Sequence, residues 1–369
     1  MPSDGLITST THGVPVIPID LTLRPAKRWI EAGEEHRKAI GGIADAAWSL
    51  IEDHWNEVLT MSVQRFPAGS LFHRLAKAVG PRLRNMPAHV GLLGSYVARL
   101  LGAEYADEVK GLARSANIHS GKLFALNLSY DISQAAGIMG QACSSASFVD
   151  SNGHPVLARN LDWCMPDCLG HYSCEVEFSN QLGTYRSIGV LGFVGVLSAM
   201  RPERWAVTLN QAPCHRSLIA PLQMPACMLL RWACDSSRSY TALKNNLAAW
   251  VPMAPFLAHM IGTTPNQQHL IQHTGPYAHV INSKDKSLAQ TNHYLDPGEG
   301  PELNERCNVG DYCDRHRLLT SRLERIDGTS SGHAMKLLTG TTLTYWATQQ
   351  QMSLSPATGR HALRVRPKR

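Results

Sequence analysis

A cysteine, an arginine and an aspartate lie at the two ends of one short segment and could together carry nucleophilic chemistry. Cys143 opens the run CSSASFVD, and Arg159 and Asp162 close the run HPVLARNLDW, with Asn152-Gly153 between the two runs. The thiolate is the nucleophilic form of cysteine, and a nearby guanidinium stabilises it. If the chain were cut before Cys143, the new α-amine could serve as the base, and a carboxylate could orient that amine. These residue types suit catalysis by a cysteine.

The two runs have the alternating pattern of a β-hairpin, which has to position those side chains. Asn-Gly is a preferred two-residue turn, and a turn at Asn152-Gly153 sets Cys143 directly opposite Asp162. The same register places Arg159 opposite Ala146, on the other face, so a bulge would be needed to turn Arg159 towards Cys143. The simpler alternative is a hairpin that contains a buried free cysteine and a surface ion pair.

The elements around this hairpin change character along the chain. The first 142 residues are mostly helical in pattern: an amphipathic helix is expected from Pro25 to about Leu59, a second from Val90 to Leu101, and a third over YADEVKGLARSANI and KLFALNLSYDIS. From Cys143 to about Asn210 short β-type runs alternate with turn residues, as in an antiparallel meander. The strand pattern includes the apolar stretch SIGVLGFVGVLSAM.

Helical patterning returns from Pro221 to Met260 and is followed by the strand-like runs HLIQHT, HVINS and SLAQTN. Residues 295–311 have turn residues and no apolar period, so a long loop is expected there. A final helix is expected to begin near Asp314. Helices, sheet, helices and sheet in this order predict an α+β fold whose layers share one core.

Composition excludes several classes of protein. With 369 residues, 44% of them hydrophobic and 17% charged, the chain has the composition of a globular protein of one or two domains. The net charge of +6 is spread along the chain, and the basic run RVRPKR has no accompanying aromatic and basic module, so no nucleic-acid partner is expected. No basic start is followed by an apolar block, and a cytoplasmic protein is expected.

The nine cysteines do not predict a disulfide framework or a metal site. Their number is odd, and the sequence shows no secretory signal. Cys164, Cys168 and Cys174, with His171 between them, lack the CxxC spacing of structural zinc sites. Buried or surface thiols are the simpler interpretation, and neither a metal nor a cofactor is expected.

Several motifs in the same order along the chain resemble those of N-terminal-nucleophile cysteine amidases. CSSASFVDSNGHPVLARNLDW is similar to the start of the catalytic subunit in the acid ceramidase and N-acylethanolamine acid amidase group, relatives of choloylglycine hydrolases and penicillin acyltransferases. VPVIPIDLTLRPAKRW, GLARSANIHSGKLFALNLSYDIS, GFVGVLSAMRPERWAVTLNQ and SLAQTNHY also resemble segments of that family. The resemblance implies a four-layer αββα sandwich.

The resemblance also implies roles for individual residues. Cys143 would be the nucleophile, with Arg159 and Asp162 holding the thiolate and the amine. Asn292 would donate its amide to the oxyanion, although by itself it is an ordinary asparagine at a strand end. Supporting or substrate-binding positions are implied at four further residues: Asn160, Trp163, Asn210 and Arg315. Arg317 is an alternative to Arg315, and either could be a solvated side chain.

The implied activity is hydrolysis of a linear N-acyl amide after the chain cleaves itself before Cys143. Residues 1–142 would form a helical segment and residues 143–369 the catalytic part, and the two fragments would stay associated through one core. An acyltransferase that passes the acyl group to an amine, and a catalytically silent binding protein of the same fold, are the alternatives.

Two features concern the environment in which such an enzyme would work. The lysosomal members carry Glu-Arg after the strand-end residue, whereas Asn210 is followed here by Gln211 and Ala212, which argues against an acidic working pH. Trp29, Trp48 and Trp55 of the first helix could form a transient lipid-binding surface, but a place in the core is the simpler interpretation.

Overall fold

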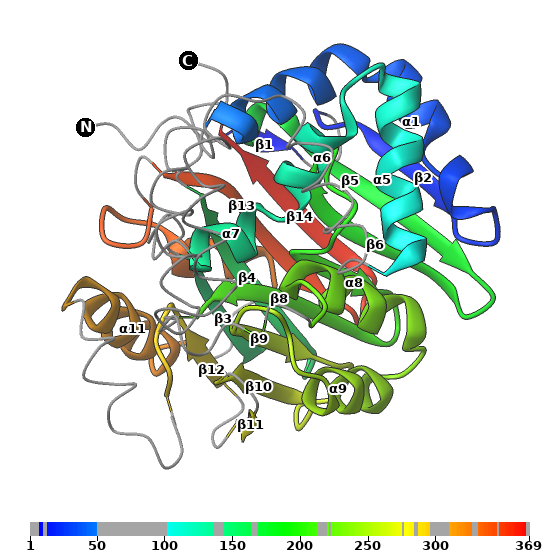
Figure 1. Ribbon diagram of the computed structural model, residues 1–369. Helices are drawn as coiled ribbons and strands as arrows, with labels where there is room; N and C mark the ends of the chain where they lie inside the picture. The colour runs from blue at the N-terminus through cyan, green and yellow to red at the C-terminus, as the bar shows by residue number, and fades with distance from the viewer. Residues whose placement is uncertain are drawn as a thin grey trace, which may run out of the picture.

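The structure is a computed structural model that describes residues 7–9, 13–49, 102–135, 143–163, 169–212, 220, 223–274, 277–283, 287–295, 310–326, 331–344 and 347–366. Two β-sheets lie face to face with helices on both outer sides (Figure 1). This arrangement confirms the α+β class and the αββα layers that the resemblance implied.

The larger sheet has eight strands in the order β11-β10-β9-β8-β7-β6-β5-β2. Its strands are β2 (Val16–Asp20), β5 (Ser173–Asn180), β6 (Gly183–Val190), β7 (Ser198–Arg201), β8 (Trp205–Gln211), β9 (Phe256–Ile261), β10 (Gln268–His273) and β11 (Ala278–Asn282). All neighbours pair antiparallel except β2, which runs parallel to β5.

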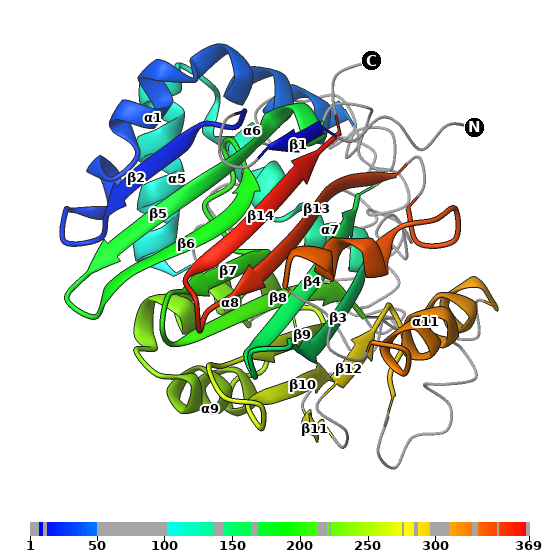
Figure 2. The same ribbon diagram turned by 180° about the vertical axis from the view of Figure 1, so that it is seen from behind.

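The smaller sheet has six strands in the order β1-β14-β13-β4-β3-β12 and is seen from its own side in Figure 2. Its strands are β1 (Ile7–Ser9), β3 (Ser144–Val149), β4 (Pro155–Asp162), β12 (Ser287–Gln290), β13 (Thr348–Ser355) and β14 (Arg360–Val365). Strands β3 and β4 are buried along almost their whole length, because layers cover both faces of this sheet.

Helices cover the outer face of each sheet. On the larger sheet lie η1 (Pro25–Lys27), α1 (Ile30–Glu35), α5 (Ala103–Ala116), α6 (Ser120–Asn127), α7 (Ser129–Ala135), α8 (Ala226–Ser236) and α9 (Tyr240–Ala249), with residues 37–49 also helical. The smaller sheet is covered by α11 (Gly310–Leu323) and η4 (Ser331–Leu338), and η2 (Leu169–Tyr172) precedes β5. None of the described helices is long and apolar enough to cross a bilayer.

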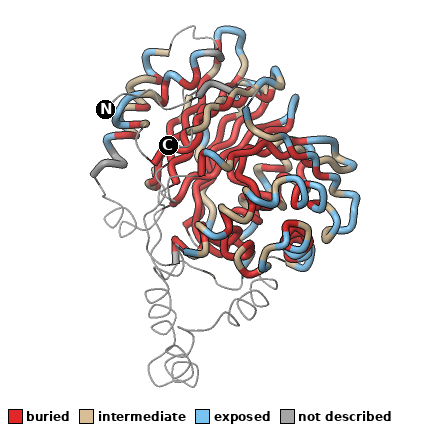
Figure 3. The backbone as a smooth tube through the Cα atoms, turned by 90° about the horizontal axis from the view of Figure 1, so that it is seen from above, coloured by how far each residue is buried: buried red, intermediate tan, exposed pale blue. Residues whose placement is uncertain are grey.

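The core divides by layer into separate apolar clusters. Figure 3 shows buried residues along the strands in the middle of the molecule and exposed residues mainly at its outside. The largest apolar cluster joins the helices to the larger sheet, and a smaller cluster joins the other sheet to α11 and η4. Between the sheets, Leu157 and Met352 pack against Ile188, Ala206 and Ile261. The inter-sheet space is therefore apolar at one end, whereas its other end holds the polar side chains described below.

The amino-terminal segment contributes one strand to each sheet. β1 pairs with β14 at one edge of the smaller sheet, and β2 pairs with β5 at one edge of the larger sheet. The long helix expected from Pro25 is instead interrupted: η1 and α1 precede a further helical run over residues 37–49. Residues 51–59 and the helix expected from Val90 to Leu101 lie outside the described residues.

The expectation of helix from Pro221 to Met260 is wrong at its end. The chain leaves α9 at Trp250, and Phe256–Ile261 forms β9, a strand whose residues are all buried. When both faces of an element are buried, its apolar residues do not alternate with polar residues. The spacing of apolar residues then does not distinguish a buried strand from a buried helix. The stretch SIGVLGFVGVLSAM contains the end of β6 and the start of β7, as expected, and residues 191–197 connect the two strands.

The register expected for the β3–β4 hairpin is also wrong, by one residue. The turn contains three residues rather than two: Asp150 N–H donates to His154 O at 2.9 Å, and Gly153 has a φ of +80°. This is the hairpin loop in which a residue in the left-handed region follows a type I turn. Ser145 consequently lies opposite Arg159 instead of opposite Asn160.

Candidate active site

The observed register brings Cys143 and Arg159 to the same face without a bulge in this hairpin. Cys143 directly precedes β3, and its side chain follows the alternation of Ser145, which faces the larger sheet. A shift of one residue exchanges the faces of a strand. Arg159 therefore points inward with Cys143, while Asp162 belongs to the outer face with Asn160.

Arg159 spans the gap between the sheets and holds a fixed position beside the sulfur. Its side chain is fully buried. Nη1 donates to Leu197 O at 2.7 Å and to Ser198 Oγ, and Nη2 donates to Leu209 O and to Cys143 Sγ, the latter at 3.6 Å. The carbonyl oxygens of Leu197 and Leu209 and the hydroxyl of Ser198 orient the guanidinium, so its charge lies where it stabilises a thiolate.

Arg315, on α11, approaches Cys143 from the opposite side of the strand. Its Nη1 donates to Cys143 O at 3.2 Å and lies 3.9 Å from Asp162 Oδ2, and its Nη2 donates to Asn292 Oδ1 at 3.0 Å. Arg317 is exposed and pairs with Asp314 within the same helix. The geometry therefore selects Arg315 from the two arginines that the sequence left open.

Asn292 follows β12, and both the oxygen and the nitrogen of its side-chain amide form hydrogen bonds. Arg315 can only donate hydrogen bonds, so the oxygen of the Asn292 amide faces it and the nitrogen faces the other way. That nitrogen donates to Gln211 O at 2.8 Å. An amide nitrogen carries two hydrogens, and the second can be donated to an oxyanion.

Asp162 is a buried carboxyl group whose pKa is raised to about 7. Burial is the largest cause, because it disfavours the charged form. The charge of Arg315, a hydrogen bond from Thr348 and the charge of Arg159 act in the opposite direction but do not outweigh burial. A further cation in direct contact with Asp162 would favour its charged form.

The remaining residues implied by the resemblance have different surroundings. Asn160 donates to Leu338 O and Leu343 O, at 3.0 and 2.7 Å, so it ties β4 to the outer helical layer rather than facing Cys143. Trp163 is buried in the large apolar cluster. Asn210 lies between the sheets next to Ser145 and joins β8 to the segment that leads into Asn292.

Gln211, the residue that follows Asn210 at the end of β8, is buried and contacts α7 through its side chain. Its side-chain nitrogen donates to Gln134 Oε1 on α7 at 2.9 Å, and Gln134 in turn donates to Ala212 O at 2.7 Å. This contact joins two neutral amides. Such a pair is insensitive to pH in the acidic range.

Sequence reasoning missed the polar side chains of the larger sheet that face β3 and its neighbour β12. His259 contacts Ser145 and Ser147, and Gln272 Nε2 donates to Gln290 Oε1 at 2.9 Å. A possible signal for His259 was its place as the one polar residue in the apolar run FLAHMI. Its partners, however, lie more than a hundred residues away in the chain.

Neither the tryptophans nor the cysteines form a second site within the described parts of the chain. Trp29 is buried and donates to Glu108 Oε2 at 2.7 Å, so it belongs to the core. Trp48 is partly exposed, and Trp55 lies outside the described residues. Cys174 is buried, which raises the pKa of its thiol, while Cys164 and Cys168 lie outside the described residues.

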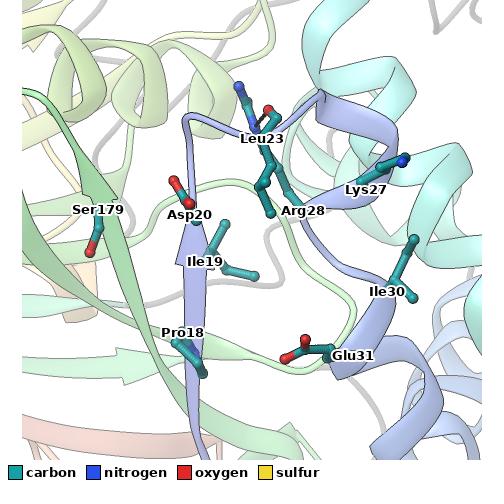
Figure 4. Close-up of a pocket in the computed structure, with 9 residues that line it drawn as sticks. All are labelled: Pro18, Ile19, Asp20, Leu23, Lys27, Arg28, Ile30, Glu31 and Ser179. Atoms are coloured by element: carbon teal, nitrogen blue, oxygen red, sulfur yellow. Dashed lines mark hydrogen bonds between the residues drawn. The ribbon is translucent and has the colours of Figure 1, made fainter.

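A surface pocket of about 480 Å³ lies between β2, its following turn, η1, α1 and β5. Figure 4 shows Pro18 and Ile19 of β2 facing it, with Ile30 and Glu31 on the helical side. None of the residues that line it is among those described around Cys143. This pocket is therefore separate from the candidate site.

Comparisons with known proteins agree with the motifs. No family model matches the sequence. The chain is 26% identical over 220 residues to the N-acylethanolamine-hydrolyzing acid amidase of Cavia porcellus, a match that covers 58% of this chain and 59% of that protein. It is 23% identical over 265 residues to the acid ceramidase of Homo sapiens, covering 66% and 59% of the two chains.

A solved structure of the Caenorhabditis elegans N-acylethanolamine-hydrolyzing acid amidase ortholog aligns with a TM-score of 0.49 and 19% identity. It covers 58% of this chain and 93% of the other. The chain thus spans about three fifths or less of the curated relatives named above. In sequence, the chain is therefore similar to the N-acylethanolamine-hydrolyzing acid amidases and acid ceramidases, in agreement with the ordered motifs.

Proposed function

We propose that this chain is a cysteine amidase that hydrolyses a linear N-acyl amide after cleaving itself before Cys143. The observation that carries the proposal is the approach of two guanidinium groups to one buried cysteine from opposite faces of its strand. Arg159 contacts the sulfur and Arg315 contacts the carbonyl oxygen of the same residue. A buried free cysteine that served only packing would not need two buried cations.

Cleavage between Ala142 and Cys143 would create the base that the site requires. The Cys143 sulfur attacks the carbonyl carbon of Ala142, and the peptide nitrogen leaves as the new α-amine. Water then hydrolyses the resulting thioester. Asp162 lies on the side from which Arg315 reaches the main chain of Cys143. Its carboxylate would accept a hydrogen bond from the new ammonium, which supplies the neighbouring cation that favours the charged form of Asp162.

Turnover of a substrate would then follow the same geometry. The thiolate attacks the amide carbonyl, and Asn292 donates its second amide hydrogen to the oxyanion. The α-amine of Cys143 protonates the departing amine and afterwards takes a proton from the water that attacks the thioester. The free acid leaves, and the thiolate is restored.

The relatives indicate the class of substrate. Their names describe hydrolysis of N-acylethanolamines and of ceramide, which both carry an apolar acyl chain on an amide nitrogen. We infer the same class of substrate here.

The test is to incubate purified protein with N-acylethanolamines and N-acylsphingosines of several chain lengths and to measure the released fatty acid by mass spectrometry. Acid is expected from the wild-type protein and not from a folded Cys143→Ala variant. Adding a free amine distinguishes the acceptors, because an acyltransferase would produce a new amide. Acid release that survives Cys143→Ala would refute the proposal.

A further inference from the structure

A buried histidine joins the strand of the nucleophile to the larger sheet. His259 lies on β9, is fully buried, and its ring nitrogens contact two serines of β3. Nδ1 lies 3.0 Å from Ser145 Oγ, and Nε2 lies 2.9 Å from Ser147 Oγ. Burial lowers the pKa of His259 to about 3, so the ring is neutral and has one donor and one acceptor nitrogen.

Ser145 is the meeting point of three strands. Besides His259 on β9, its hydroxyl contacts Asn210 on β8, whose Nδ2 donates to it at 3.2 Å. The same nitrogen of Asn210 donates to Gln290 O and Thr291 O, both at 3.2 Å. A continuous path of hydrogen bonds therefore runs from the ring of His259 through Ser145 to the backbone immediately before Asn292.

This path joins the two groups that must act together on a substrate. Ser145 follows Cys143 by two residues on the same face of the strand, and Thr291 directly precedes Asn292. Ser147 contacts the same ring but lies further along β3, away from Cys143. The two serines are equally buried, so they differ mainly in which of them is connected to Asn210.

We propose that His259 is a positioning residue that acts through Ser145 and Asn210 to hold Cys143 at a fixed separation from Asn292. The proposal rests on the proposed amidase function. In the tetrahedral intermediate the sulfur is bonded to the carbon that carries the oxyanion, so the two groups have to engage adjacent atoms. A small error in their separation weakens the hydrogen bond to the oxyanion more than the binding of substrate.

The matched variants are Ser145→Ala and Ser147→Ala, which each remove one hydrogen bond to the same imidazole. Both should lower the unfolding midpoint in urea, Ser145→Ala by somewhat more because its hydroxyl also accepts a hydrogen bond from Asn210. Only Ser145→Ala is expected to lower kcat, by roughly 10- to 100-fold as for other small misplacements of reacting groups, with KM changed less than about twofold. Equal kcat values for the two variants would overturn the proposal.

Substitution of the histidine gives a second measurement if Ser145→Ala does not fold. The amide of His259→Asn reaches the place of Nδ1, and that of His259→Gln reaches the place of Nε2. The asparagine variant should recover more of kcat than the glutamine variant, because only it can restore the contact with Ser145. The reverse order would contradict the proposal. A wild-type protein that releases no acid from any substrate would overturn both this inference and the amidase assignment.

Discussion

The state of Asp162 is expected to differ between the uncut and the cut chain. In the uncut chain burial raises its pKa to about 7, against about 4 for an unfolded aspartate. Between these values the folded state retains a proton that the unfolded state has released. The free energy of unfolding should therefore fall as the pH rises from 4 to 7, since the group is increasingly held in its less favourable charged form.

Asp162→Asn in an uncleavable Cys143→Ala background tests this prediction. The substitution should reduce the fall of the free energy of unfolding between pH 4 and 7. It should also make the protein more stable at pH 8 by at least about 1 kcal/mol, because one pKa unit corresponds to about 1.4 kcal/mol. Urea unfolding across this pH range measures the difference. Asp131, whose pKa burial also raises to about 7, remains in both proteins as a common background. Parallel stability curves would show that Asp162 is not strained by burial.

In the cut enzyme the same residue should matter for the chemistry. If Asp162 orients the freed amine of Cys143, the neutral amide of Asp162→Asn should lower kcat by roughly 100-fold or more, because the misoriented base loses its contribution of about 10²–10⁴. Stopped assays of acid release on protein confirmed as cleaved would measure this. Unchanged kcat in the cleaved variant would remove Asp162 from the site.

The turn of the β3–β4 hairpin depends on one glycine. Gly153 has a φ of +80°, and a Cβ built there meets no atom within 4 Å. Backbone conformation alone should therefore determine the cost of a side chain. Gly153→Ala is expected to destabilise the protein by about 1 kcal/mol, and Gly153→Asn by less, since asparagine tolerates the left-handed region. Chemical denaturation of the two variants measures the order; equal stabilities would show that the turn relaxes.

A buried ionic cluster joins α5 to α8 across the proposed cleavage point. Arg231 of α8 lies 3.3 Å from Glu108 of α5 and 2.9 Å from Asp235, and it stacks over the ring of Phe178 at 3.8 Å. Arg231 and Glu108 are completely buried. Removing one partner of such a cluster leaves a buried charge without its full compensation, which costs about 3–5 kcal/mol.

Arg231→Met should therefore lower the free energy of unfolding by that amount while retaining most of the side-chain volume. Lys122→Met is the matched control. Lys122 also forms an ion pair, with Asp45, but on the surface, where such pairs contribute about 0–1 kcal/mol. Thermal or urea unfolding of both variants gives the comparison. A loss below 1 kcal/mol for Arg231→Met would mean that the cluster relaxes or admits water.

At the scale of the whole molecule, the fragments 1–142 and 143–369 should remain one particle after cleavage. The first fragment supplies β1 to the smaller sheet and β2 to the larger sheet. Tyr130 OH of α7 also donates to Pro255 O at 2.7 Å. Losing this fragment would expose two sheet edges and the apolar surface beneath α5 and α6.

Denaturing mass spectrometry of active protein should show both fragments, while size-exclusion chromatography under native conditions should show a single peak. Added salt should not separate the fragments, since buried ion pairs are screened far less than exposed ones. Cys143→Ala should remain one chain. Elution of residues 143–369 alone from native buffer would contradict the shared core, and full activity of a verified uncut chain would exclude the N-terminal-nucleophile mechanism.

The sequence alone determined which residues could do chemistry and which elements carry most of them. Cys143, Arg159 and Asp162 were recognisable from their types and from the alternating runs around them. Strands β3 to β6 and β8 lie where those runs predicted, because turn residues bound them and their alternation is local. Local patterns also predicted the helix that contains Arg315. The autocleavage and the cytoplasmic location stay predictions.

Only the tertiary structure decided how these residues meet. The three-residue turn at Gly153 put Arg159 on the face of Cys143 and Asp162 on the other face, a difference that turn composition did not reveal. The choice of Arg315 over Arg317 depended on which side of α11 packs against β3. His259 acquires its partners only when the two sheets face each other. These contacts join residues far apart in the chain, so their geometry follows from the packing of layers and not from local sequence.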